Sequence, residues 1–298
     1  MDVSKFVQTL FDSMSSGAIY ASLALGLVLV HRATHIPNFA QGELAMLSAF
    51  IAWELSDRGA PWLAAFLGAL AISFVIGFAI ERGVIRWVEG ASPLTLLIVT
   101  LGLLSVINGG AGWRWGYLPK AAESPFDGNI RFGSDSDPIV VSWQTVGIIL
   151  VLLAVMAAIF VMFNRTKLGL GLRAAANNAG SARLVGISVG GMLAMGWGLA
   201  ALVGASGGVM VAPNLGLQPN MMASVMIFAF AGAVLGGFDS PPGAVFGGFV
   251  VGLVQNFTAA YWQPHGQQLS LFLAFALIMV VLLVRPNGIF GRAEVSRV

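Results

Sequence analysis

Glu43 is the residue in this sequence that is best suited to binding or proton chemistry. It is a carboxylate inside an otherwise apolar block that also holds Asn38 and Gln41. A carboxylate near mid-membrane costs a few kcal/mol, so it needs a polar partner, a wet cavity or a place near the interface. These three side chains are therefore candidates for lining a polar path or gate, or for binding a small solute directly.

A structural role fits the same residues. Pro37 disfavours helix at the residue before it, and Asn38 can cap a helix that starts after it. Glu43 would then lie early in that helix, where the positive end of the helix dipole stabilises a carboxylate. The residue types leave both interpretations open.

Metal and catalytic chemistry find little support. His31 and His35 are four residues apart, and no acidic or cysteine ligand nearby completes a set with them; the chain has no cysteine. We find neither a Gly-x-Ser-x-Gly elbow nor a phosphate-binding glycine loop. We therefore expect no metal, no cofactor and no enzymatic activity, and any ATP-driven work would need nucleotide binding in another subunit.

Composition places the chain in a membrane. It is 57% hydrophobic and 9% charged, with a mean hydropathy of +0.86, and apolar blocks near the roughly 20 residues needed to cross a bilayer recur along it. A net charge of +2 does not suggest a nucleic-acid partner. We predict an all-α polytopic bundle, one transmembrane domain over residues 1–298 with eight or nine spans. The predicted spans are approximately Phe6–Val30, Asn38–Glu54, Trp62–Ile80, Pro93–Asn108, Val140–Phe163, Gly190–Ala212, Met221–Leu235, Ala244–Ala260 and Leu269–Val284.

The second and seventh of these blocks are the weakest, since one is polar and the other short, and either could be a broken helix. Ser92-Pro93 is a strong start signal for the fourth, with a capping serine before a proline at the first helical position. Pro37-Asn38 and Pro213-Asn214 each open a polar stretch, which hints at two related halves.

Lysine and arginine predict the orientation, because basic residues are retained on the cytoplasmic side. Alternating spans put ten of the fifteen basic residues on the side of residues 164–188, and the acid-containing segment 113–138 on the outside. With nine spans the amino terminus is outside. The ten are Arg32, Arg82, Arg86, Arg165, Lys167, Arg173, Arg183, Arg285, Arg292 and Arg297; the other five are Lys5, Arg58, Arg114, Lys120 and Arg131.

The loop 164–188 is basic and free of acidic residues. Its alanine-rich part, Leu172 to Leu184, predicts a short helix parallel to the membrane that could fit a groove on a nucleotide-binding subunit. A plain positive loop that fixes topology is the alternative. Elsewhere, glycines at four-residue spacing predict close helix packing, although some could line a path or a subunit contact. These are the pairs Gly232 with Gly236, Gly243 with Gly247 and Gly248 with Gly252, and the patch Gly204-Ala-Ser-Gly-Gly208.

Several segments, in order along nearly the full length, resemble the Liv-type permease family of branched-chain amino acid ABC importers, in its H-like branch. They are Gly26-Leu-Val-Leu-Val, Pro37-Asn-Phe-Ala-Gln-Gly-Glu43, Gly169-x-x-x-Arg173-Ala-Ala-Ala, Ala182-Arg-Leu-Val-Gly-Ile187, Leu235-Gly-Gly-Phe-Asp-Ser-Pro-Pro-Gly-Ala244 and Arg285-Pro-Asn-Gly-Ile-Phe-Gly291.

The resemblance implies a multi-pass subunit of the bacterial inner membrane that takes an amino acid or small polar solute from an external binding protein. A homologous permease and two ATP-binding subunits would complete the importer, in contact with membrane lipid. The resemblance also implies a cytoplasmic coupling helix, although the glutamate of the wider Glu-Ala-Ala pattern is missing. Its residues would be Arg173, Ala174, Ala175, Ala176, Gly180, Arg183 and Gly186. A secondary transporter or channel for a small polar solute is the alternative.

Overall fold

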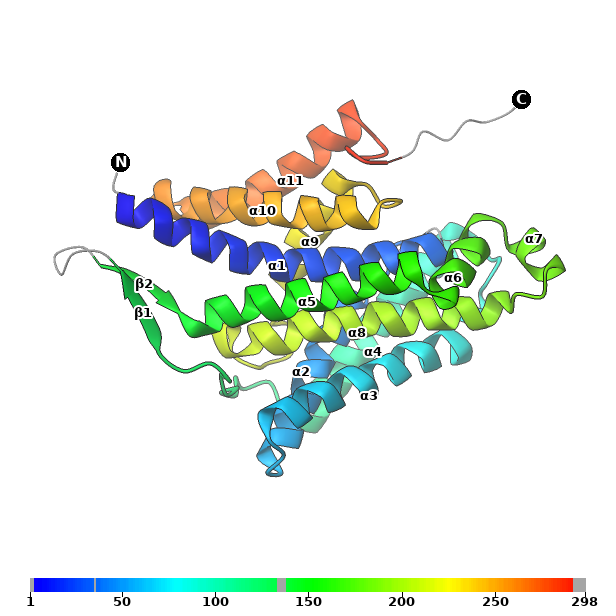
Figure 1. Ribbon diagram of the computed structural model, residues 1–298, viewed down its shortest axis with the longest axis horizontal. Coiled ribbons are helices and arrows are strands. Elements are labelled where there is room, and N and C mark those ends of the chain that lie inside the picture. Colours follow the sequence, from blue (N-terminus) through cyan, green and yellow to red (C-terminus); the bar gives the residue numbers. More distant parts are fainter. Residues whose placement is uncertain (1–2, 35, 133–137, 292–298) are drawn as a thin grey trace. The chain divides into compact units, whose positions relative to one another are not determined.

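The computed structural model describes residues 3–34, 36–132 and 138–291 (Figure 1). His35 and most of the predicted Ser-Asp-Ser-Asp-Pro turn at 134–138 lie outside the described residues. The chain forms two compact units that interleave along the sequence. The first unit takes the described parts of residues 1–25, 124–152 and 224–298, and the second takes those of 26–123 and 153–223.

The all-α prediction is confirmed, and a helix lies at each of the nine predicted spans. These helices are α1 (Val3–Thr34), α2 (Gln41–Asp57), α3 (Trp62–Gly83), α4 (Pro93–Trp115), α5 (Trp143–Arg165), α8 (Val189–Leu215), α9 (Ala223–Gly236), α10 (Pro241–Tyr261) and α11 (Gly266–Val284). Within the described residues, seven are long and apolar enough to cross a membrane. The other two are α2 and α9, with 17 and 14 residues. At about 1.5 Å per residue they are shorter than a hydrocarbon core of about 30 Å.

The predicted and observed ends of these nine helices agree within four residues, except where the fourth helix ends. The fourth helix was expected to end near Asn108 but continues to Trp115, because the glycines that follow Asn108 are accommodated inside the helix; Gly116, at φ 81°, ends it. Its predicted start is confirmed, since the Ser92 hydroxyl accepts a hydrogen bond from the Thr95 amide at 3.3 Å. The fifth helix begins at Trp143 and not near Val140.

The residues just before α5 form a strand, which the sequence analysis missed. β2 (Ile139–Ser142) pairs antiparallel with β1 (Asn129–Phe132), with Asn129 opposite Ser142 and Phe132 opposite Ile139. The β-branched run of β2 favours extended backbone. β1 therefore lies within the segment predicted as an external loop, and β2 follows just after that segment.

The core of the second unit is built around α8, which packs against both α2 and α3. Glycines allow the close approach: an added Cβ at Gly208 would collide with the Ala45 carbonyl of α2, and one at Gly198 would lie 2.8 Å from the Phe74 ring of α3. Trp197 and Phe50 are the largest fully buried side chains there. The small patch predicted from Gly204 to Gly208 is thus a packing surface.

In the first unit, glycines of α10 approach two other helices. An added Cβ at Gly252 would lie 2.5 Å from Gly17 Cα of α1, and one at Gly232 of α9 would lie 2.8 Å from Gly248 Cα. Tyr20 of α1 stacks on Phe228 of α9 with ring centroids 5.2 Å apart. The predicted use of the four-residue glycine spacing in helix packing is confirmed.

Candidate functional site

The turn before α2 differs in part from its prediction. Asn38 does not cap the helix: the N-cap position is Ala40, and the Asn38 side-chain oxygen accepts the Ala40 amide at 3.0 Å. That bond closes a local turn two residues before the helix. Glu43 lies in the first turn of α2, as predicted, where the helix dipole favours a carboxylate.

The polar side chain of Gln41 lies between α2, which carries it, and the helices α1 and α8. It is fully buried, and its Nε2 donates to the Ala200 carbonyl of α8 at 2.8 Å. Gly26 of α1 and Gly204 of α8 make room for it, since an added Cβ at either would lie 2.5 Å from that nitrogen. Gln41 Oε1 and Asn38 Nδ2 are buried without a hydrogen-bond partner among the described residues. Two buried polar atoms at the start of α2 therefore lack a partner within the described part of the chain.

Glu43 belongs to a chain of three polar side chains. The Asn108 side-chain amide of α4 donates to the Glu43 carboxylate at 3.1 Å and to the Asn220 side-chain oxygen at 2.8 Å. Glu43 is 6% exposed, whereas Asn220 is exposed and has a φ of 73°. This polar chain, Glu43–Asn108–Asn220, joins α2, α4 and the turn before α9. It runs from a buried carboxylate to an exposed amide.

The sequence analysis only partly found this arrangement. Asn108 was predicted as the end of the fourth span, and it was not placed beside Glu43. The Pro-Asn pair that directly precedes α9 is Pro219-Asn220, whereas Pro213-Asn214 lies in the last turns of α8. Two features of the sequence could have indicated these residues. Asn108 is an asparagine within an apolar helix, and Asn220 is an asparagine directly after a proline.

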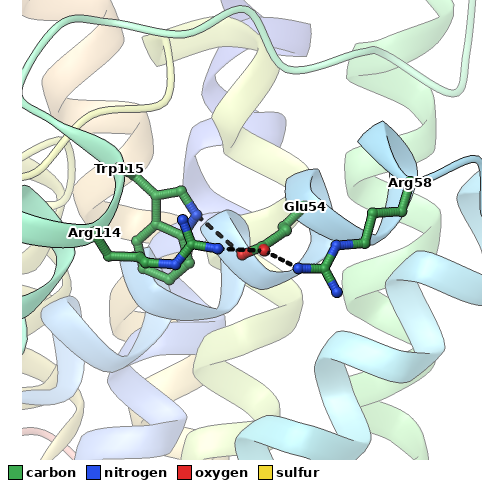
Figure 2. A network of polar contacts seen from close by, with 4 residues as sticks. All are labelled: Glu54, Arg58, Arg114 and Trp115. Atoms are coloured by element: carbon green, nitrogen blue, oxygen red, sulfur yellow. Dashed lines mark hydrogen bonds and ion pairs between the residues drawn. The ribbon is translucent and has the colours of Figure 1, made fainter.

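At its other end, α2 is fastened to α4 by a second network (Figure 2). The Glu54 carboxylate accepts hydrogen bonds from Arg58, from Arg114 at 2.8 Å and from the Trp115 indole at 3.1 Å. The Trp115 ring also stacks on Phe50, with centroids 4.8 Å apart. Sequence reasoning missed this network, because its members lie up to 61 residues apart.

The predicted short helix at Leu172 to Leu184 is two helices, α6 (Lys167–Asn177) and α7 (Ala179–Leu184). The break falls at Asn178, whose side-chain oxygen accepts the Ser181 amide at 2.9 Å and caps α7. Ala175 of α6 and Ala182 of α7 are buried in one cluster with Val189 and Leu193 of α8. Both helices are thus attached to the start of α8.

The end of α7 is held by a Schellman motif. The Ile187 amide donates to the Ala182 carbonyl and the Gly186 amide to the Arg183 carbonyl, both at 3.0 Å. Gly186 has a φ of 81°, the left-handed conformation that the motif requires at this position. The two residues before it are apolar but open to solvent: Leu184 is 90% exposed and Val185 is 75% exposed.

The predicted coupling residues besides Ala175 differ in how exposed their side chains or backbones are. Gly180, Arg183 and Gly186 are exposed, and Arg173, Ala174 and Ala176 are half-buried. The Arg173 Nε donates to the Gly169 carbonyl at 3.4 Å.

Five basic residues of the second unit lie in two groups. Arg32 and Arg173 line one small cavity, and Arg86 lies beside Gly190 at the start of α8. The second group lies near the carboxyl-terminal end of α2. Arg114 contacts Glu54 there, and the Lys120 ammonium lies 4.7 Å from the Trp53 ring centroid. Which end faces the cytoplasm stays a prediction.

The long apolar helices, the buried polar chain and the two short helices attached at one end define a multi-pass membrane protein of the permease class. The family described as "Branched-chain amino acid transport system / permease component" matches residues 9–282, and the chain belongs to that family.

Relatives match over nearly the full length. The chain is 30% identical to the high-affinity branched-chain amino acid transport system permease protein BraD of Pseudomonas aeruginosa, over 100% of this chain and 99% of the relative. It is 31% identical to LivH, the corresponding permease protein of Escherichia coli K12, over 98% of each chain. The solved structure of PsaBC from Streptococcus pneumoniae in complex with Fab has a TM-score of 0.50 and 12% identity, and covers 95% of this chain and 92% of that chain. That likeness concerns the fold alone.

The expected H-like branch of the Liv-type family is therefore confirmed. As a member of this family the chain is a multi-pass, inner-membrane translocation component and not an enzyme. It works with further permease, ATPase and binding-protein components of an ABC transport system.

Proposed function

We propose that the chain is one of two homologous permease subunits in an importer that takes up branched-chain or related amino acids. Two ATP-binding subunits would drive it, and an external solute-binding protein would deliver the cargo. The observation that carries this proposal is the family match over residues 9–282, with relatives named as branched-chain amino acid permeases.

The whole chain would act as one transmembrane domain, with residues 113–138 outside and residues 164–188 in the cytoplasm. The gathering of basic residues at opposite ends of the second unit supports this orientation. Cargo would then enter at the end that carries Glu54 and leave at the end that carries α6 and α7.

The coupling segment is α6, α7 and the turn after them. Gly180, Arg183 and Gly186 would face the ATP-binding subunit, while Arg173 to Ala176 tie the segment to the membrane helices. The exposed Leu184 and Val185 would add an apolar contact that the sequence analysis did not name. Because Ala175 and Ala182 are buried against α8, a displacement of α7 moves the start of α8.

Asn38, Gln41 and Glu43 would line or gate the path, together with Asn108 and Asn220. Gln41 bonds directly to α8, so a movement of α8 reaches the start of α2. The Asn108 amide shares its donors between Glu43 and Asn220, and such a shared contact can be exchanged for contacts to a zwitterionic solute.

The test is ATP-driven uptake in proteoliposomes that contain the permease pair, the ATP-binding subunits and the binding protein. Gly180→Glu with Arg183→Glu should abolish uptake while ATP hydrolysis continues, because the acidic groups disturb the contact but leave the buried face of α7 intact. Arg285→Glu is the control for the charge reversal at Arg183, because Arg285 is exposed and follows α11, outside the coupling segment.

Uptake at the unaltered rate in the double variant would refute the assigned contact. Uphill flux by the permease alone, without ATP-binding subunits, would instead favour a secondary transporter. Ligand binding to the cognate external protein, measured with leucine, isoleucine, valine and other small solutes, tests the cargo separately.

A further inference from the structure

The second unit contains a cavity of about 280 Å³ near the end of α2, and none of the residues assigned to the polar path line it. Its floor is apolar and buried, and is made by Ala49 of α2, Ala65 and Phe66 of α3 and Val209 of α8. Small-molecule pockets begin at about 300 Å³ and are mostly apolar with a few polar groups. The cavity therefore has the size and floor of a site for a compact ligand.

Its rim has a different chemistry. Asp57 at the end of α2 and Glu123 in the following loop bring two carboxylates to the lining, and Trp53 and Trp62 add aromatic rings. The described lining contains no lysine, arginine or histidine. Of the nearest basic groups, Arg58 pairs with Glu54, as Figure 2 shows, and Lys120 lies over the Trp53 ring.

The walls are fixed by contacts of their own. Lys120 and Leu217 exchange two backbone hydrogen bonds of 2.9 Å, which anchors the strand-like segment that carries Glu123. Trp62 stacks on Phe66 with ring centroids 5.1 Å apart. The cavity is therefore preformed, so binding need not order its walls first.

We propose that this cavity binds a small organic cation, namely a primary ammonium group on a compact apolar body. The carboxylates of Asp57 and Glu123, both exposed, would hold the ammonium group, with the Trp62 ring adding cation–π attraction. The alkyl body would lie on the alanine and valine floor. An anion of the same shape is disfavoured by the two carboxylates, and the proposed polar path through Glu43 uses none of these residues.

The experiment compares three probes of one shape on the purified permease in lipid nanodiscs, without partner subunits. The probes are 3-methylbutylammonium, 3-methylbutanol and 3-methylbutanoate, titrated by calorimetry against empty nanodiscs as the blank. We expect the ammonium probe to bind most tightly and the carboxylate probe most weakly. Because this comparison uses the unaltered protein and no transport, its outcome is independent of the importer proposal.

Asp57→Asn and Glu123→Gln should each weaken binding of the ammonium probe by about two- to fivefold, the range for an exposed charge pair. Asp127→Asn removes a carboxylate of the same loop outside the cavity lining, and should leave the affinity unchanged. Ala52→Leu should fill part of the cavity and weaken binding of all three probes. Equal affinity for the ammonium and carboxylate probes would overturn the proposal, as would unchanged binding after both carboxylate substitutions.

Discussion

Leu184 and Val185 allow the proposed contact with the ATP-binding subunit to be tested quantitatively. Burial of a leucine or valine side chain contributes about 1.5–3 kcal/mol. Because these two are 90% and 75% exposed, nearly all of that contribution is still available to a partner. Replacing both with serine should therefore cost roughly 2.5–5 kcal/mol of association free energy, a loss of about one hundredfold or more in affinity.

The assay is binding of the ATP-binding subunits to permease in nanodiscs, with uptake measured in parallel. Leu118→Ser is the matched control, because Leu118 is 83% exposed but lies in the loop after α4, near the opposite end of the second unit. We expect the control to bind normally. If the Leu184→Ser, Val185→Ser variant inserts normally and retains the original affinity, the apolar contact is not part of the interface.

Substitutions at three further positions test the packing and the polar chain. Gly186→Ala should destabilise the end of α7 by about 1 kcal/mol, because alanine disfavours the left-handed conformation, and should lower coupled uptake without preventing insertion. Glu43→Leu should reduce uptake strongly by leaving the Asn108 amide without its acceptor, whereas Glu43→Gln should retain part of the activity; equal uptake by both variants would argue against a role for the polar chain. Gly208→Val should lower the Tm of the purified permease, since its Cβ would collide with the Ala45 carbonyl, and an unchanged Tm would contradict that packing.

The positions of the membrane helices were predictable because a bilayer imposes a length and a polarity that composition records directly. The start of α4 was predictable for a local reason, since Ser92 and Pro93 are both suited to a helix start. The two weakest predicted spans are α2 and α9, the two shortest of the nine helices at predicted spans. The hydropathy of the sequence therefore also indicated which two helices, α2 and α9, are shorter than a full bilayer crossing.

The lateral contacts were not predictable, because they join residues that are distant in the sequence. Asn108 is 65 residues from Glu43 and 112 from Asn220, and nothing in the local pattern pairs them. The cavity that carries Asp57 and Glu123 depends in the same way on α2, α3, α8 and a loop coming together. By contrast, the break at Asn178 had a local signal, since asparagine favours the N-cap position, but the surrounding alanines obscured it.

α8 connects the coupling segment to the candidate path, and its glycines explain how. At its start, Val189 and Leu193 pack against α6 and α7, and further along the Ala200 carbonyl accepts the hydrogen bond from Gln41. The backbone of α8 approaches α2 closely at Gly208, and the backbone of α3 approaches α8 closely at Gly77. Packed helices of this kind slide or rotate as bodies more readily than they bend. A displacement of α7 should consequently reach Gln41 as a movement of α8 as a whole. The proposed gate and the proposed coupling segment would then move together.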